Sequence, residues 1–140
     1  LHTFDTNNGS GDNHICYAFH SVEGYSKIGS YTGNGSSDGT FTHCGFRPAW
    51  VMVKRTNSTS AWTILDNKRD PSNEMDTILN ANATTVESGF GTTNRNVDFL
   101  SNGFKIRYTT AGGLTDLNTS GSTYIFLAFA EAPFKLANAR

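Results

Sequence analysis

Two apolar stretches that each contain a tryptophan limit what this chain can fold into. Residues 49–55 (AWVMVKR) are apolar for five positions in a row and include two β-branched valines, whereas residues 61–66 (AWTILD) alternate apolar and polar side chains. Both patterns are typical of β-strands. The polar residues 57–60 between them suit a hairpin. Because Trp50 and Trp62 would each bury a large aromatic surface, we expect this hairpin to form the centre of the core.

The rest of the chain is rich in turn formers and contains no long amphipathic helical pattern. Thr, Asn, Ser and Gly together make up 59 of the 140 residues, and only 16% of the residues are charged. This composition favours short strands joined by many turns. Further strands are predicted at residues 14–20, 27–32, 40–43, 97–100, 104–108 and 122–130, and a strand or a single helical turn at 77–81.

Two of these predicted elements carry more detailed expectations. The run at 122–130 is the most apolar in the chain, so we expect a central strand that is buried on both faces. Asn102 and Gly103 lie between the strands 97–100 and 104–108, and an Asn-Gly pair is typical of a tight hairpin turn with positive φ.

These elements together predict an all-β fold. We expect an antiparallel β-sandwich, of jelly-roll or lectin-like type, with long loops and no substantial helix. The length of 140 residues suits one domain over 1–140, in which 1–13 would be a flexible lead-in rich in turn formers. The predicted core includes Trp50, Trp62, Phe104, Phe126 and Phe129.

Charge and hydropathy exclude two classes of partner. The net charge of −1 and the pI of about 6.4 provide no basic surface for nucleic acid. The apolar runs are too short to cross a bilayer, so we expect no membrane insertion.

The first residue is Leu, which suggests a fragment or C-terminal module of a longer protein. Cys16 and Cys44 lie in apolar contexts that favour buried thiols, and a disulfide between them is the alternative.

No pattern of catalytic or metal-binding residues stands out. The four histidines have no ligand-like spacing, so we expect no metal and no cofactor, with a calcium loop at 5–12 as an open alternative. Asp66 and Asp70 enclose Lys68 and Arg69, whose charges would lower the pKa of both carboxyl groups. A salt-bridged loop is therefore favoured over a catalytic pair. We expect no enzymatic activity, and a glycan depolymerase fragment is the alternative.

Six sequence blocks follow one another in a recognisable order between residue 14 and the end of the chain. They are CYAFHSVEGYSK at 16–27, GSYTGNG at 29–35, GFRPAWVMVKR at 45–55, DNKRDP at 66–71, DFLSNGFKIR at 98–107 and YIFLAFAEAPFK at 124–135. Together they resemble a β-domain that recurs in the tail fibres and related surface proteins of tailed bacteriophages, many of them from aquatic environments.

The resemblance implies a virion structural protein of the tail fibre or particle surface, assembled in the host cytoplasm. The leading hypothesis is an adhesin module that recognises a host surface glycan or protein. The alternative is a structural decoration or fibre-assembly module that contacts only other virion proteins, and a large apolar patch on one flank would favour it. The implied partners are other virion proteins and further copies of the chain, because fibres of this kind are generally trimeric. The resemblance supplies no catalytic residue.

A surface rich in amides, hydroxyls and aromatic rings suits sugar hydroxyls and stacking. On this basis we assign the ligand contacts to Tyr25, Tyr31, Asn34, Asp38 and Asn57. After Pro133 ends the last strand, Phe134 and Leu136 are expected either to cover the bottom of the sandwich or to pack around a shared axis of an oligomer.

Overall fold

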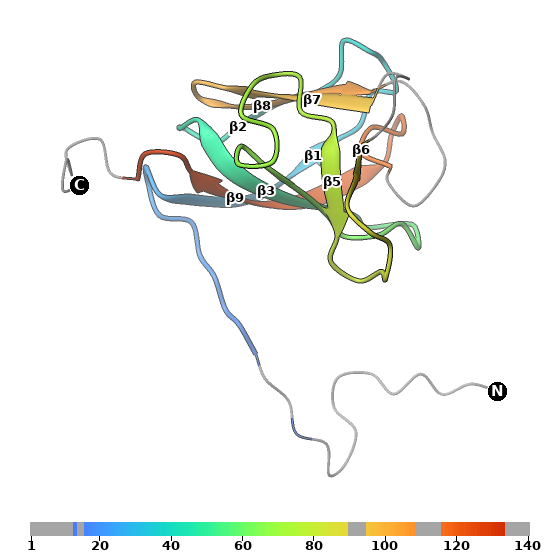
Figure 1. The fold of residues 1–140 in the computed structure, drawn as a ribbon, viewed down its shortest axis with the longest axis horizontal. Helices are drawn as coiled ribbons and strands as arrows, with labels where there is room; N and C mark the ends of the chain where they lie inside the picture. The colour runs from blue at the N-terminus through green and yellow to red at the C-terminus, as the bar shows by residue number, and fades with distance from the viewer. Residues whose placement is uncertain (1–12, 14–15, 90–94, 109–115, 134–140) are drawn as a thin grey trace.

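The chain folds into β-strands alone over the part that the structure describes. The computed structural model describes residues 13, 16–89, 95–108 and 116–133, in which there are nine strands and no helix (Figure 1). The described residues therefore contain no helix that could cross a membrane. The expectations for residues 1–12 and for Phe134 and Leu136 lie outside this part of the chain.

The strands form two antiparallel sheets that pack face to face (Figure 1). The large sheet has six strands in the order β1 (Ser26–Thr32), β9 (Thr123–Ala130), β3 (Pro48–Arg55), β4 (Thr63–Asp66), β5 (Thr77–Asn80) and β6 (Ser88–Gly89). The small sheet has three strands in the order β2 (Phe41–His43), β8 (Gly103–Tyr108) and β7 (Arg95–Leu100). The predicted antiparallel β-sandwich is confirmed, and its jelly-roll or lectin-like type stays a prediction.

The predicted hairpin forms the middle of the large sheet. β3 and β4 are its third and fourth strands, paired from Trp50↔Asp66 to Val53↔Thr63. Residues 77–80 form a strand and not a helical turn. The strand predicted at 14–20 is wrong over residues 16–20, which are exposed and belong to no strand.

The core lies between the two sheets and is built mainly by alternate residues of the longer strands. Phe104 and Phe126 are buried as predicted, and their ring centroids lie 5.3 Å apart in an edge-to-face contact. Tyr31 and Tyr124 stack at 4.9 Å. The remaining apolar core residues are Cys44, Phe46, Val51, Val53, Leu65, Met75, Ile78, Val97, Phe99, Ile106, Leu117 and Ala128.

The prediction that both tryptophans lie in the core is wrong. Trp50 and Trp62 are half-buried, because Val51 and Val53 take the inward positions of β3 and alternation turns Trp50 to the opposite face. Phe129 is also half-buried, on the same face as Trp50. All three rings therefore lie on the outer side of the large sheet.

Gly103 is required for a different reason from the one the sequence predicts. Its φ is outside the left-handed region, but a Cβ atom there would lie 2.1 Å from the carbonyl oxygen of Thr42 on the neighbouring strand. The glycine thus allows β8 to approach β2 closely at the start of their pairing, His43↔Gly103.

A buried carboxylate joins the segment before β9 to the large sheet. Asp116 is 3% exposed, accepts hydrogen bonds from Tyr124 Oη (2.8 Å) and Thr119 Oγ1, and forms an ion pair with Arg55. Burial raises the pKa of Asp116, but the hydrogen bonds from Thr119, Tyr124 and Arg55 outweigh it and leave this pKa below its ordinary value. Burial and the same carboxylate raise the pKa of Tyr124 to about 12.

The two cysteines do not form a disulfide bond. Cys16 is exposed and Cys44 is buried, and both are free thiols. The disulfide alternative is therefore wrong, and so is the expectation of burial for Cys16. Burial raises the pKa of the Cys44 thiol to about 12, which makes it unreactive at neutral pH.

Replacing Asp116 tests this network through its pH dependence. Because the pKa of Asp116 is lowered on folding, its contribution to stability is present above the unfolded value of about 4 and is lost as the pH falls through the folded value. Asp116→Asn should therefore lower the free energy of unfolding by about 3 kcal/mol at pH 7 and by much less at pH 3, measured by urea denaturation. Asp38→Asn, which breaks an exposed ion pair with Lys105, should change little. Equal losses for Asp116→Asn at both pH values would contradict the assignment.

Candidate functional site

The outer face of the large sheet carries a continuous row of apolar side chains. The strand registers place one such residue from each of five neighbouring strands side by side: Ile28, Leu127, Met52, Ile64 and Leu79. Ile28 and Leu79 at the two ends are 38% and 37% exposed, and the three between them are half-buried. In a two-layer sandwich the outward positions are ordinarily polar. This row, with its flanking aromatic residues, is here called the outer apolar face.

Aromatic rings lie beside the row, two residues along β9 and β3 from Leu127 and Met52. Phe129 is the centre of this group, with ring centroids 5.7 Å from Trp50, 5.8 Å from Tyr25 and 6.1 Å from Phe19. Tyr25 and Phe19 come from the segment that precedes β1, so they are added to the face from outside the sheet. Edge-to-face contacts of this kind stabilise the cluster beyond the area that it buries.

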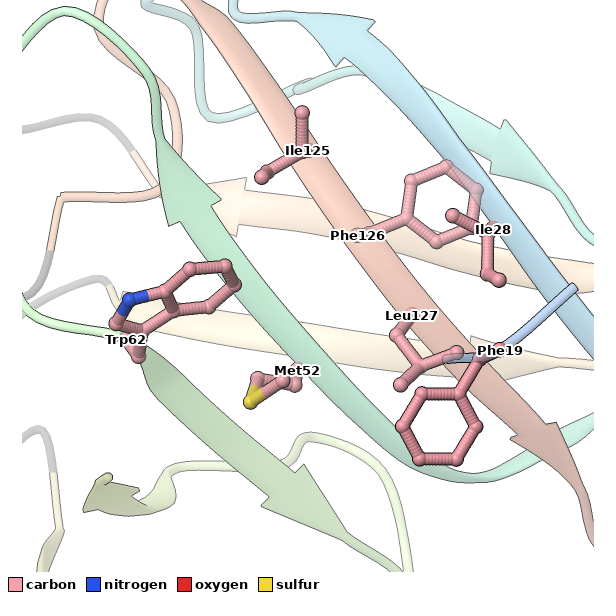
Figure 2. Close-up of a pocket in the computed structure, with 7 residues that line it drawn as sticks. All are labelled: Phe19, Ile28, Met52, Trp62, Ile125, Phe126 and Leu127. Atoms are coloured by element: carbon pink, nitrogen blue, oxygen red, sulfur yellow. The ribbon is translucent and has the colours of Figure 1, made fainter. Parts of the chain in front are cut away.

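A hollow of about 250 Å³ opens in the outer apolar face. Figure 2 shows Trp62 on one side of it, Phe19 and Ile28 on the other, and Met52 and Leu127 between them. Ile125 and Phe126 complete the lining. Gly29 lies opposite Phe126 in the β1–β9 pairing, and a Cβ atom there would come within 2.9 Å of the Phe126 ring. A glycine at this position thus leaves room for the ring beside the hollow.

The charged groups beside the face are held locally. Lys54, in register with Ile125, donates to the carbonyl oxygens of Arg55 (2.7 Å) and Ser58 (2.8 Å). Asp66, in register with Trp50, accepts from Arg69 Nε at 2.7 Å. The face therefore offers apolar contact without a strong electrostatic preference.

The outer face of the small sheet has the opposite character. Asp98 accepts from Arg107 Nε at 2.7 Å, and Lys105 forms an ion pair with Asp38. Such charged pairs are what a solvated sheet face ordinarily presents. The two sheets therefore differ in the chemistry of their outer faces.

The structure does not bring the five predicted ligand residues together. Tyr31 is 7% exposed and donates to the carbonyl oxygen of Leu117, so it offers no ring to a surface ligand. Tyr25 directly precedes β1 and lies beside Phe129, whereas Asn34 and Asp38 follow the far end of that strand. These residues therefore do not form a single site.

The loop after β1 uses its polar groups internally. Asn34 Oδ1 accepts from Asn118 Nδ2 and from the backbone of Ser36, both at 3.0 Å, and Asn34 Nδ2 donates to the carbonyl oxygen of Asp38 at 2.9 Å. Asn57 is exposed, and its Oδ1 accepts from Arg55 Nε at 2.7 Å. These amides hold loops in place.

The charged loop after β4 is a salt-bridged loop, as the sequence predicts. Asp66 pairs with Arg69, while Asp70 accepts from the backbone of Asp76 (2.9 Å) and from the backbone of Thr77 (2.7 Å). Burial raises the pKa of Asp66, but the hydrogen bonds from Arg69 and Lys68 lower it by more. The pKa of Asp66 is therefore below its ordinary value. A lowered pKa opposes a role as a general acid near neutral pH.

A second hollow, of about 280 Å³ and more polar, lies at one end of the sandwich. It is lined by residues that include Gly24, Gly45, Asn102 and the ion pair of Arg47 with Glu131, whose atoms Nε and Oε2 are 2.9 Å apart. This end also holds the turn between β7 and β8.

Sequence reasoning missed the outer apolar face, although part of its signal is in the chain. β9 is apolar at every position from Tyr124 to Ala130, which the sequence analysis attributes to burial on both faces. The inner positions Tyr124, Phe126 and Ala128 are buried, but Ile125 on the other face is 39% exposed. The predicted strand is confirmed, but its second face has no covering layer within the described residues.

The fold defines an antiparallel β-sandwich with one charged and one apolar outer face. Comparison with protein families assigns the chain further: it belongs to the family described as "Domain of unknown function (DUF7483)", whose model matches residues 2–133. No curated protein and no solved structure matches it.

Stability measurements can separate the core from the outer apolar face. Phe104→Ala removes a fully buried ring and should lower the free energy of unfolding by about 3–5 kcal/mol. Trp62→Ala removes a half-buried ring at the edge of the hollow and should cost less than half as much, roughly 1–2 kcal/mol. Urea denaturation of both variants measures the difference, and equal losses would show that Trp62 belongs to the core.

Proposed function

We propose that this chain is a non-enzymatic structural module of a bacteriophage virion surface protein, and that its outer apolar face binds other protein. The sequence blocks that resemble tail-fibre domains support the virion assignment. The observation that carries the binding role is the five-residue row from Ile28 to Leu79. An apolar patch of this kind, rimmed by polar residues, is typical of a protein contact.

The chemistry of the hollow favours a protein partner over a sugar. The indole N–H of Trp62 is the one polar side-chain group among its seven lining residues. A sugar buried there would leave most of its hydroxyls without hydrogen-bond partners, at a cost of about 1–3 kcal/mol for each. Apolar side chains of a protein carry no such penalty. The outer apolar face thus supports the assembly role, the alternative of the two sequence hypotheses.

The arrangement of the carboxylates supports a role without catalysis. Asp66, Asp70 and Asp116 all accept hydrogen bonds from other protein groups, and none of the three lines either hollow. A catalytic acid would need a raised pKa in a cleft, whereas the pKa values of Asp66 and Asp116 are lowered.

Recognition of a host glycan is the second candidate, and it belongs to the polar hollow. Asn102, Arg47 and Glu131 provide amide, guanidinium and carboxylate groups around a space of about 280 Å³. Grouped donors and acceptors of this kind are what a sugar requires. Tyr25 follows Gly24 of the lining and brings an aromatic ring close to this end.

Matched lysine substitutions in the viral gene test the proposal. Ile28→Lys places a charge on the outer apolar face, and Phe41→Lys places one on the small sheet at a residue of similar exposure, 42% against 38%. We expect Ile28→Lys to reduce incorporation of the protein into purified particles at least tenfold, measured by mass spectrometry, and Phe41→Lys to leave it unchanged. Thermal melts check that both variants fold.

Two results would contradict the proposal. Absence of the protein from purified wild-type particles would remove the virion assignment, and equal incorporation of both variants would remove the role of the outer apolar face. Saturable binding on a glycan array that is lost in Asn102→Ala would instead support the second candidate.

A further inference from the structure

A second apolar feature without a covering partner lies next to the outer apolar face. Residues 16–20, here called the arm, precede β1, form no strand and are exposed throughout. Tyr17 is 80% exposed and Phe19 is 57% exposed. In extended backbone these two side chains point to the same side. The arm thus has the apolar alternation of a strand, but no sheet to join.

The base of the arm is fixed to the edge of the large sheet. Ser21 Oγ accepts from the backbone N–H of Ile28 at 3.0 Å and donates to the carbonyl oxygen of the same residue. Ser26 Oγ donates to the carbonyl oxygen of His20 at 3.0 Å. Since Ser21 occupies the backbone groups of Ile28, the arm does not continue as a strand beside β1. It runs away from the outer side of the large sheet instead (Figure 1).

The direction of the arm separates Tyr17 from the hollow of its own copy. Phe19 already packs against Phe129 at the rim. Tyr17 lies two residues further along the outgoing chain, about 7 Å in extended backbone. Tyr17 is therefore not among the residues that line the hollow of its own copy.

The hollow has the size of one large side chain. Its volume of about 250 Å³ is below the range of roughly 300–1,000 Å³ that is usual for small-molecule sites. A tyrosine ring would contact Met52, Leu127 and Trp62, and its hydroxyl could stay at the open mouth.

We propose that the arm of one copy of this chain lies across the outer apolar face of a second copy and places Tyr17 in the hollow. The proposal rests on one part of the proposed function, that this face binds protein, and it names the partner. Within the described residues, Tyr17 has an aromatic side chain that packs in no pocket, and the hollow is an apolar pocket that no side chain fills. Lys54 and Asp66 carry opposite charges and are held by local hydrogen bonds, so these two residues give the face no net charge.

The area of the face is sufficient for such a contact. Five strands about 4.8 Å apart span about 20 Å, and the four-residue distance from Phe129 to Ile125 adds about 13 Å in the other direction. With its side chains the face offers roughly 500 Å² in each copy, so two copies bury on the order of 1,000 Å², the lower bound of a specific interface. Transfer of an arm from each copy to its neighbour is compatible with a closed dimer or trimer.

Disulfide trapping between two different variants tests the proposal. The first variant is Cys16→Ser with Ile125→Cys, which has a thiol on the rim of the hollow and none on the arm. The second is the wild-type chain, whose arm carries Cys16, while the buried Cys44 stays unreactive. Tags of different mass distinguish the two chains, so a disulfide of mixed mass must join separate copies.

We expect mild oxidation with copper–phenanthroline to give the mixed disulfide as the main cross-linked product. The matched control replaces Ile125→Cys by Val86→Cys, an 82% exposed position outside the face, and should give at least tenfold less. Absence of the mixed product, or equal amounts from both positions, overturns the arm exchange. The incorporation of the protein into particles is measured separately, so failure here leaves the virion assignment intact.

The mass of the native protein provides a second readout. Wild-type protein at micromolar concentration should be a dimer or trimer by light scattering, and Tyr17→Ser should lower the mass to that of the monomer with an unchanged melting temperature. Val86→Ser, which removes an equally exposed apolar side chain, should keep the wild-type mass. A wild-type monomer at this concentration, or a Tyr17→Ser oligomer of wild-type mass, would contradict the proposal.

Discussion

The alternation of side chains along β9 and β3 determines both the core and the outer apolar face. These neighbouring strands pair from Trp50↔Phe129 to Arg55↔Tyr124, so a shift by one residue would exchange their inner and outer sets. The inner set, which includes Val51 and Phe126, is buried against the small sheet. The outer set, which includes Met52 and Leu127, is almost as apolar. Both sets are hydrophobic, but packing against the small sheet buries only the inner set. The outer set stays partly exposed on the outer apolar face.

The polar networks explain how a chain so rich in amides and hydroxyls keeps a defined shape. Asp116, with Arg55, Thr119 and Tyr124, ties the segment before β9 to the end of β3. Asn118, 2% exposed, joins the same segment to the loop after β1. Asn34 and Asn57, two of the predicted ligand residues, therefore use their amides in hydrogen bonds within the fold. Such groups stabilise a structure when buried and paired, and are costly when their partner is lost.

The sequence predicts the fold well and the surface poorly, for physical reasons. Strand position follows from local patterns, so β3, β4 and β9 are found from their residues alone. Which face of a strand is covered depends on how many layers pack on the sheet, and a local pattern does not contain this information. For this reason the prediction that Trp50 and Trp62 lie in the core fails. The arm is mispredicted for a different reason. Its alternation predicts a strand, but Ser21 Oγ bonds the N–H and C=O groups of Ile28 that a strand paired with β1 would need.

The two methionines of the chain allow the most direct test of the account. Met52 lies on the outer apolar face and is half-buried, whereas Met75 is 1% exposed in the core and serves as an internal reference. Oxidation by hydroxyl radicals, read by mass spectrometry, compares Met52 in assembled particles with Met52 in dilute Tyr17→Ser protein. Coverage of the outer apolar face in the particle should lower oxidation of Met52 several-fold, and Met75 should stay protected in both samples. Equal oxidation of Met52 in the two samples would show that the outer apolar face stays uncovered, and would contradict the account.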